Sequence, residues 1–183
     1  MLVAVAGVVA LMAMSPASRA SPRGSPIVYG YPYAPACPLA GVAERVDRFG
    51  MYACNCTSYV AWALHANGKR TDWFIRGAMD AFNWPHVARL KGLQVVSTPA
   101  VGAVAVMPRL GGKLGHVAFV TGVGPGNLFS VAEYNLPSWT SGTRFEFDVR
   151  SGVSAAGTEF IIVPRTRGPS QVEGENHLTG GLA

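Results

Sequence analysis

The half of the chain that follows Pro99 alternates short β-rich runs with turn residues, and this pattern constrains the fold more tightly than any other sequence feature. Runs rich in β-branched and aromatic residues, separated by Gly, Pro, Asn and Ser, are typical of antiparallel strands joined by turns. The expected strands are 102–107, 115–123, 128–134, 144–149 and 159–163. We therefore expect a small, mostly antiparallel sheet in this half of the chain.

The segment from Thr57 predicts a helix that precedes the sheet. Apolar residues recur at helical spacing in TSYVAWALHANG, and Asn67 with Gly68 supplies a left-handed stop. Asn55 and Thr57 are candidate N-caps. Cys56 is therefore expected at the N-terminus of this helix.

Composition divides the chain into four segments. Residues 1–20 are interpreted as a signal peptide, because an uncharged apolar stretch precedes a run of small residues that resembles a cleavage site. A short anchor and a buried core helix are the alternatives for this segment. Residues 21–39 are expected to form an extended arm rich in Pro and Tyr, residues 40–164 the catalytic domain, and residues 165–183 a flexible tail. We expect an exported protein that is secreted or associated with the cell wall.

The charge of the chain argues against a nucleic-acid-binding protein. The formal net charge is +5, and it falls to +4 if Arg19 leaves with the signal peptide. The basic residues are scattered, without a Lys/Arg run or interleaved aromatic residues. A mild positive charge favours residence on an anionic polymer such as a bacterial wall.

The three cysteines predict one disulfide and one free thiol. An odd cysteine in an exported protein suggests a reactive thiol or an intermolecular bridge, and the spacing of Cys54 and Cys56 strains a bond between them. A bond between Cys37 and Cys54 would close a loop of about 18 residues and stabilise the fold by roughly 3 kcal/mol. We predict this pairing, which leaves Cys56 reduced.

Cys56 and His116 are the candidate nucleophile and base. A helix N-terminus lowers the pKa of a thiol and offers free backbone N–H groups to an oxyanion. His116 opens the predicted strand 115–123, where one edge of its ring can be exposed, and Gly115 would let another backbone approach closely. A passive core cysteine and a surface histidine are the structural alternatives.

Strand register nominates the group that orients the imidazole. If Val123 pairs with Leu128 across the turn 124–127, the numbers of paired residues sum to 251. His116 then lies opposite Asn135 and diagonal to Glu133, and all three share one face of the sheet. A slip of one residue would move both candidates to the other face.

Two further predictions concern metal binding and contact with the substrate. The chain has no C-x-x-C pair, no H-x-x-x-H spacing and no acidic calcium loop, so neither a metal nor another cofactor is expected. Trp139 lies in the predicted loop 136–142, directly after Glu133 and Asn135. It is the candidate substrate-contacting aromatic residue, with a packing role as the alternative.

Four motifs in this order resemble the CHAP domain, the cysteine, histidine-dependent amidohydrolases/peptidases of the papain-like superfamily. The resemblance covers roughly residues 40–164. The motifs are Asn55-Cys-Thr-Ser-Tyr-Val-Ala-Trp62, Pro99-Ala-Val-Gly-Ala-Val-Ala105, Gly115-His-Val-Ala-Phe-Val120 and Ala132-Glu-Tyr-Asn135. The resemblance implies a papain-like α+β fold, in which an N-terminal helix bearing the nucleophile packs on a small antiparallel sheet.

The resemblance also implies roles for individual residues and a substrate. Cys56 corresponds to the family nucleophile, His116 to its base, Glu133 to the orienting acid and Asn135 to a polar residue beside it, while Asn55 borders the oxyanion site. The family acts mostly on peptidoglycan, at the muramoyl-L-alanine bond or at peptide bonds of stems and cross-bridges. We expect a monomeric hydrolase without membrane attachment after signal cleavage. A catalytically inactive wall-binding module and an amidase acting on a non-wall amide are the alternatives.

Overall fold

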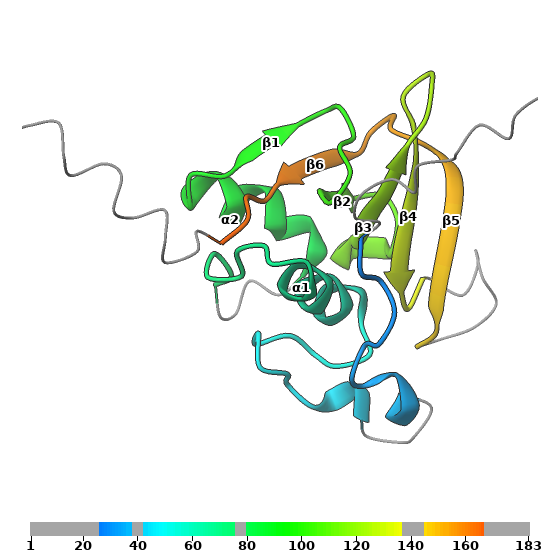
Figure 1. Ribbon diagram of the computed structural model, residues 1–183. Coiled ribbons are helices and arrows are strands. Elements are labelled where there is room, and N and C mark those ends of the chain that lie inside the picture. Colours follow the sequence, from blue (N-terminus) through cyan, green and yellow to red (C-terminus); the bar gives the residue numbers. More distant parts are fainter. Residues whose placement is uncertain (1–25, 38–41, 76–79, 137–144, 167–183) are drawn as a thin grey trace, which may run out of the picture.

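This computed structural model describes residues 26–37, 42–75, 80–136 and 145–166. The strands among these residues form a single antiparallel sheet (Figure 1). The strand order among the described residues is β1-β6-β2-β3-β4-β5, with every neighbouring pair antiparallel. The strands are β1 (Gln94–Val96), β2 (Val104–Met107), β3 (His116–Val123), β4 (Leu128–Tyr134), β5 (Phe147–Ser154) and β6 (Glu159–Ile162). The segment interpreted as a signal peptide lies outside the described residues.

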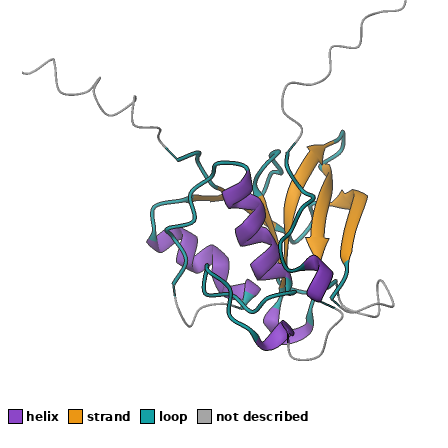
Figure 2. Ribbon diagram, turned by 60° about the horizontal axis from the view of Figure 1, so that its bottom comes forward, coloured by secondary structure: helices purple, strands orange, loops and turns teal. Residues whose placement is uncertain are grey.

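Two α-helices pack on this sheet. They are α1 (Cys56–Ala66), which packs on β3 and β4, and α2 (Trp84–Leu90), which packs on β1 and β6. Short 3-10 turns complete the described elements: η1 (Ala34–Ala36), η2 (Val42–Glu44), η3 (Ala81–Asn83) and η4 (Gly112–Leu114). Figure 2 shows the helices gathered on one side of the molecule and the strands on the other. Among the described helices, none is long and apolar enough to cross a membrane.

Helix α1 begins one residue before the predicted Thr57 and ends at the predicted stop. Asn55 occupies the N-cap position in an extended conformation, and Cys56 is the first helical residue. At the other end Gly68 adopts a φ of 66°, and the Lys69 N–H bonds to the Leu64 carbonyl at 2.9 Å. This left-handed stop satisfies carbonyls that the last turn would otherwise leave free.

The sheet separates two clusters of buried side chains. One face packs against α1 through residues such as Val117, Phe119 and Ala132. The other face holds a second apolar cluster that includes Ala118 and Val120. Alternate residues of β3 therefore enter opposite clusters, as the two-residue period of a strand requires.

The register of β3 and β4 differs from the prediction at the turn and agrees with it near His116. Val123 pairs with Phe129, one residue beyond the predicted Leu128, so the sum at the turn is 252. A β-bulge between Val120 and Gly122 takes up one residue, and Phe119 pairs with Ala132 at the predicted sum of 251. The assumed turn was wrong, but the bulge restores the face on which the site was expected.

Strand β5 extends further than the predicted 144–149, and the short strand β1 was not predicted. The predicted strand ended before Ser151 and Gly152, whereas β5 runs from Phe147 through both residues to Ser154. Gly152 has a φ of 68°, and the β4 partners shift register between Phe129 and Val131. A glycine in the left-handed region is typical of a β-bulge, which bends the strand without ending it.

The described part of the arm before the domain, residues 26–37, lies along α1 and is bonded to both ends of this helix. At the C-terminal end, the Ile27 N–H donates to Asn67 Oδ1 and Asn67 Nδ2 donates to the Ile27 carbonyl, both at 2.8 Å. At the N-terminal end, a disulfide joins Cys37 to Cys54, which is the predicted pairing. The nucleophile candidate therefore begins a helix that is fixed by the arm.

Tyr31 is the buried centre of this contact, with 4% of its surface exposed. Its hydroxyl accepts the Cys54 N–H at 2.9 Å and lies 2.6 Å from Ser58 Oγ. Because the Ser58 hydroxyl donates to Asp47 Oδ2, Tyr31 is the donor toward Ser58. This buried chain of hydrogen bonds holds the backbone on both sides of Cys56.

Tyr31→Phe should lower the free energy of unfolding by about 1–3 kcal/mol, because it leaves the buried Cys54 N–H without its acceptor. Urea unfolding of the oxidised protein measures this change. Tyr33→Phe is the matched control, since the Tyr33 hydroxyl bonds to none of the described residues and its ring contacts that of Tyr31 at 5.5 Å. Equal losses in the two variants would contradict a structural role for the Tyr31 hydroxyl.

Candidate active site

Cys56 is the free cysteine of the chain and lies partly exposed at the start of α1. Burial of its sulfur alone would raise the pKa of the thiol. The positive charge of His116, a hydrogen bond with that side chain, and the backbone N–H groups of Val117 and Thr57 outweigh burial and lower the Cys56 pKa. The local structure therefore favours a thiolate.

His116 is the first residue of β3 and is almost completely buried, with 1% of its surface exposed. Its Nε2 lies 2.8 Å from Oε2 of Glu133, which leaves Nδ1 for the Cys56 thiol. Burial by itself lowers the pKa of His116, but the Cys56 thiolate and the Glu133 carboxylate raise it to about 9. The imidazole is therefore stabilised as a cation between two anionic groups.

Glu133 on β4 has no exposed surface, and its carboxylate has two partners. Besides His116, Arg150 on β5 contacts both of its oxygens: Nε bonds to Oε1, and Nη2 lies 3.1 Å from Oε2. Burial would raise the pKa of Glu133, and hydrogen bonds from the two cationic side chains lower it instead. Glu133 is therefore ionised in this setting.

Sequence reasoning placed Cys56, His116 and Glu133 together but missed Arg150. The pairing of Val131 with Arg150 and of Glu133 with Asp148 makes Arg150 the diagonal neighbour of Glu133 on the same face. A signal for it existed, because a buried carboxylate requires a counter-charge and β5 follows β4. The register could not be derived, since no short turn joins these two strands.

Asn135 lies beside the site but bonds to Asn55 and not to His116. It follows β4 with a φ of 53°, and its Nδ2 donates to Asn55 Oδ1 at 2.8 Å. Asn55 Nδ2 in turn donates to the Ala53 carbonyl at 3.2 Å. Asn135 therefore links the end of β4 to the N-terminus of α1, and the oxyanion role of Asn55 stays a prediction.

Gly115 allows the close backbone approach that the sequence suggested. Its φ is 71°, and a Cβ built on it would lie 2.9 Å from the backbone nitrogen of Phe82. Phe82 belongs to η3, so this contact places a turn directly against the residue before His116. A side chain at position 115 requires either the turn or the base to move.

Gly115→Ala should lower the free energy of unfolding by about 2–4 kcal/mol, combining the cost of an unfavourable φ with the clash against Phe82. Thermal or urea unfolding measures the change. Gly112→Ala is a matched control, because Gly112 has a φ of 66° and nothing within 4 Å of its Cβ position. If both variants lose the same stability, the contact with Phe82 contributes nothing.

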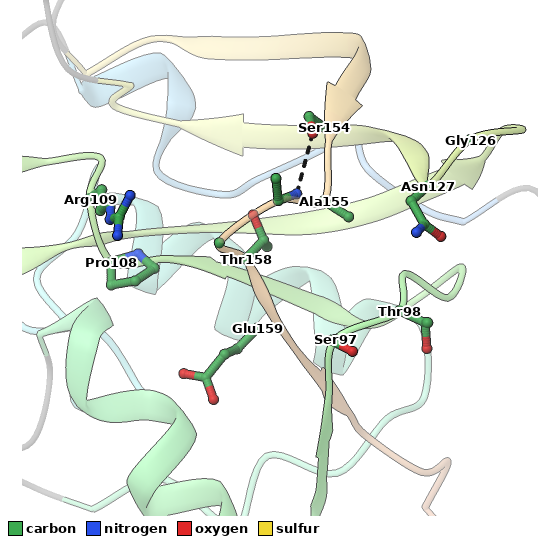
Figure 3. A pocket seen from close by; sticks show the side chains of 12 residues that line it. Ser97, Thr98, Pro108, Arg109, Gly126, Asn127, Ser154, Ala155, Thr158 and Glu159 are labelled. Atoms are coloured by element: carbon green, nitrogen blue, oxygen red, sulfur yellow. Dashed lines mark hydrogen bonds between the residues drawn. The ribbon is translucent and has the colours of Figure 1, made fainter.

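A separate hollow of about 730 Å³ contains none of these residues (Figure 3). Its single carboxylate, Glu159, is paired with Arg89 at 2.5 Å. The hollow is lined by Ser97, Thr98, Pro108, Arg109, Gly126, Asn127, Ser154, Ala155, Ala156, Gly157, Thr158 and Glu159. It offers no nucleophile–base pair, so the catalytic candidates remain those around Cys56.

Two other expectations concern Trp139 and metal ligands. Trp139 lies outside the described residues, so its contact with substrate stays a prediction. Within the described ranges, no group of three or more His, Cys, Asp and Glu side chains is arranged to hold a metal ion.

Comparison with known families identifies the region that contains this site. The family model of the CHAP domain matches residues 46–135, which include Cys56, His116, Glu133 and Asn135. The resemblance expected from the sequence is thereby confirmed. Arg150 lies beyond the matched region.

Two curated bacterial proteins resemble part of this chain. A probable autolysin of Staphylococcus aureus is 33% identical over 103 residues, which is 55% of this chain and 36% of that protein. A putative hydrolase of Streptococcus mutans is 33% identical over 92 residues, which is 49% of this chain and 41% of that protein. The chain thus spans well under half the length of the curated relatives it matches.

A solved structure shares the fold. The N-acetylmuramoyl-L-alanine amidase from Staphylococcus aureus superimposes with a TM-score of 0.51 at 24% identity, covering 62% of this chain and 31% of that one. This likeness confirms the papain-like α+β fold, with the candidate nucleophile on a helix and the candidate base on an antiparallel sheet.

Proposed function

Because residues 46–135 match the family model of the CHAP domain, we propose that this chain is an exported cysteine hydrolase that cleaves an amide bond of peptidoglycan. The observation that carries the proposal is the contiguous series of Cys56, His116 and Glu133, in which the buried imidazole and carboxylate lie 2.8 Å apart. A thiol whose pKa is lowered by an adjacent base is the arrangement that nucleophilic catalysis requires.

In the proposed reaction, the Cys56 thiolate attacks the carbonyl carbon of the scissile amide, and the electrons of the C=O bond move to its oxygen. Backbone N–H groups at the start of α1 stabilise this oxyanion. His116 then donates its proton to the nitrogen as the C–N bond breaks, which releases the amine and leaves a thioester on Cys56. Neutral His116 takes a proton from water, whose oxygen attacks the thioester carbonyl. The C–S bond then breaks, which frees the carboxylic acid and restores the Cys56 thiolate.

Glu133 and Asn135 complete the proposed site without touching the substrate. Glu133 fixes the orientation of His116 and stabilises the imidazolium, as the acid does in other catalytic triads. Asn135 holds Asn55, the residue before the nucleophile, through a 2.8 Å hydrogen bond. Both therefore act by positioning the two reacting groups.

Peptidoglycan is the proposed substrate because the names of the relatives agree with the chemistry of the site. One relative is a probable autolysin, and the structural neighbour is an N-acetylmuramoyl-L-alanine amidase. The positive net charge of the chain suits an anionic wall. Either the muramoyl-L-alanine amide or a peptide bond of the stem or cross-bridge fits an acyl transfer to a thiolate.

Mass spectrometry of the soluble fragments from purified peptidoglycan tests the proposal. Stem peptides freed from glycan would establish an amidase, and split stems or bridges an endopeptidase. Protein alkylated at Cys56 is a suitable control, because the other two cysteines form the disulfide. If walls of several chemistries yield no fragments beyond this control, the wall-hydrolase proposal is wrong and a binding module or a non-wall amidase takes its place.

A further inference from the structure

Three neighbouring strands carry three charged side chains in one continuous contact. His116 on β3, Glu133 on β4 and Arg150 on β5 share a face of the sheet, because each is the diagonal neighbour of the next in register. Glu133 Oε2 accepts hydrogen bonds from His116 Nε2, at 2.8 Å, and from Arg150 Nη2, at 3.1 Å. Glu133 Oε1 accepts a hydrogen bond from Arg150 Nε. The carboxylate is thus held on both oxygens.

Burial explains why a second cation is needed behind Glu133. Glu133 has no exposed surface, whereas 29% of the Arg150 side chain is exposed. A buried carboxylate favours its protonated form unless opposite charges and hydrogen bonds compensate. With Arg150 the charges alternate along the series from thiolate to imidazolium, carboxylate and guanidinium, and they sum to zero. Without Arg150, the thiolate, imidazolium and carboxylate together would carry one uncompensated negative charge.

The planar guanidinium of Arg150 also fixes the orientation of the Glu133 carboxylate. Its two N–H contacts set the plane of the carboxylate, and Oε2 then faces His116. Lysine offers the same charge as a single point and would leave the carboxylate free to rotate. The sulfur of Met107 lies 3.8 Å from Arg150 Nη2 and packs beside the guanidinium.

We propose that Arg150 is a positioning residue, which keeps Glu133 ionised and oriented toward His116. The inference rests on the proposed function for its effect on catalysis, but its effect on the Cys56 thiolate requires no substrate. Arg150 lies outside the segment 46–135 that matches the family, so it is a feature of this chain beyond the matched motifs.

The charged and titratable groups around Glu133 come from three elements. His116 faces it from β3, and Arg150 faces it from β5. Asp148, its direct partner on β5, interacts with Arg150. Burial raises the pKa of Tyr59 on α1, and the charges of Tyr29 and Glu133 raise it further. Arg150 is the cation in this set whose charge does not depend on pH in the working range.

Arg150→Gln and Arg150→Lys test the proposal through pH profiles of kcat/KM for wall cleavage. Loss of the guanidinium charge lets Glu133 take up a proton at higher pH, so the acidic limb of the Arg150→Gln profile should move up by about one pH unit. At neutral pH kcat should fall on the order of tenfold. Arg150→Lys keeps the positive charge but not the planar fork of the guanidinium. Its acidic limb should therefore lie close to the wild-type position, while its kcat should stay below the wild-type value. Arg70→Gln, which breaks the exposed pair with Asp72, is the control.

A substrate-free measurement separates this inference from the proposed function. The acidic half-point of Cys56 alkylation by iodoacetamide should rise by about one pH unit in Arg150→Gln. If the wild-type protein cleaves no wall but this half-point shifts, the proposed function fails and the role of Arg150 stands. If the wild-type protein is active and neither acidic limb moves, Arg150 has only a structural role and the inference is overturned.

Discussion

Replacing Cys56 with serine should reduce the release of peptidoglycan fragments by about 10⁴-fold or more. A serine hydroxyl is far less acidic than a thiol, and the setting that lowers the Cys56 pKa is insufficient to ionise it. The change replaces one atom and leaves the disulfide between Cys37 and Cys54 in place. The loss should therefore appear in the initial rate of fragment release at unchanged stability.

Cys56→Ala provides the comparison for this variant. Both substitutions should give the same residual rate, because neither side chain forms the acyl intermediate. Far-ultraviolet circular dichroism and urea unfolding would show that the fold is retained. A Cys56→Ser variant that kept a tenth of the wild-type rate would remove Cys56 from the role of nucleophile.

Glu133→Gln should lower kcat by roughly 10³–10⁴-fold, because a neutral amide neither stabilises the imidazolium nor fixes its tautomer. The pH profile supplies a second readout. The wild-type pKa of His116 is raised to about 9, in part by the Glu133 charge. Removing that charge destabilises the protonated ring, so the alkaline limb of the profile should move to lower pH.

Glu159→Gln is the matched control for the glutamate variant. Glu159 also pairs with an arginine, Arg89, but its side chain is 41% exposed and lies away from the candidate triad. This control should change neither kcat nor the alkaline limb. Glu133→Gln activity within tenfold of wild type, with an unmoved alkaline limb, would mean that Glu133 does not act through His116.

The position of the candidate triad could be predicted because local sequence patterns place each of its members. The helix start at Cys56 follows from the apolar spacing and the stop at Gly68. The face shared by His116 and Glu133 follows from strand parity, although the predicted turn pairing was wrong by one residue. The bulge before Gly122 compensated for that error, and no sequence pattern indicated the bulge.

The supporting residues could not be predicted because their contacts are set by tertiary packing. Tyr31 lies in a Pro- and Tyr-rich arm whose composition is typical of a linker, yet it is buried beneath α1. Arg150 required the register of β4 and β5, which no tight turn defines. Phe82 meets Gly115 only after η3 folds against the start of β3. Each contact joins segments that are distant in sequence.

The pH dependence of Cys56 alkylation tests the central claim most directly, because iodoacetamide reacts with the thiolate and needs no substrate. The wild-type protein should react rapidly at pH 6 and keep a nearly constant rate until His116 loses its proton at a pKa of about 9. His116→Gln should react slowly at pH 6, with a rate that rises around an ordinary thiol pKa of about 8.5. Superimposable profiles for the two proteins would show that His116 does not activate Cys56 and would contradict the account.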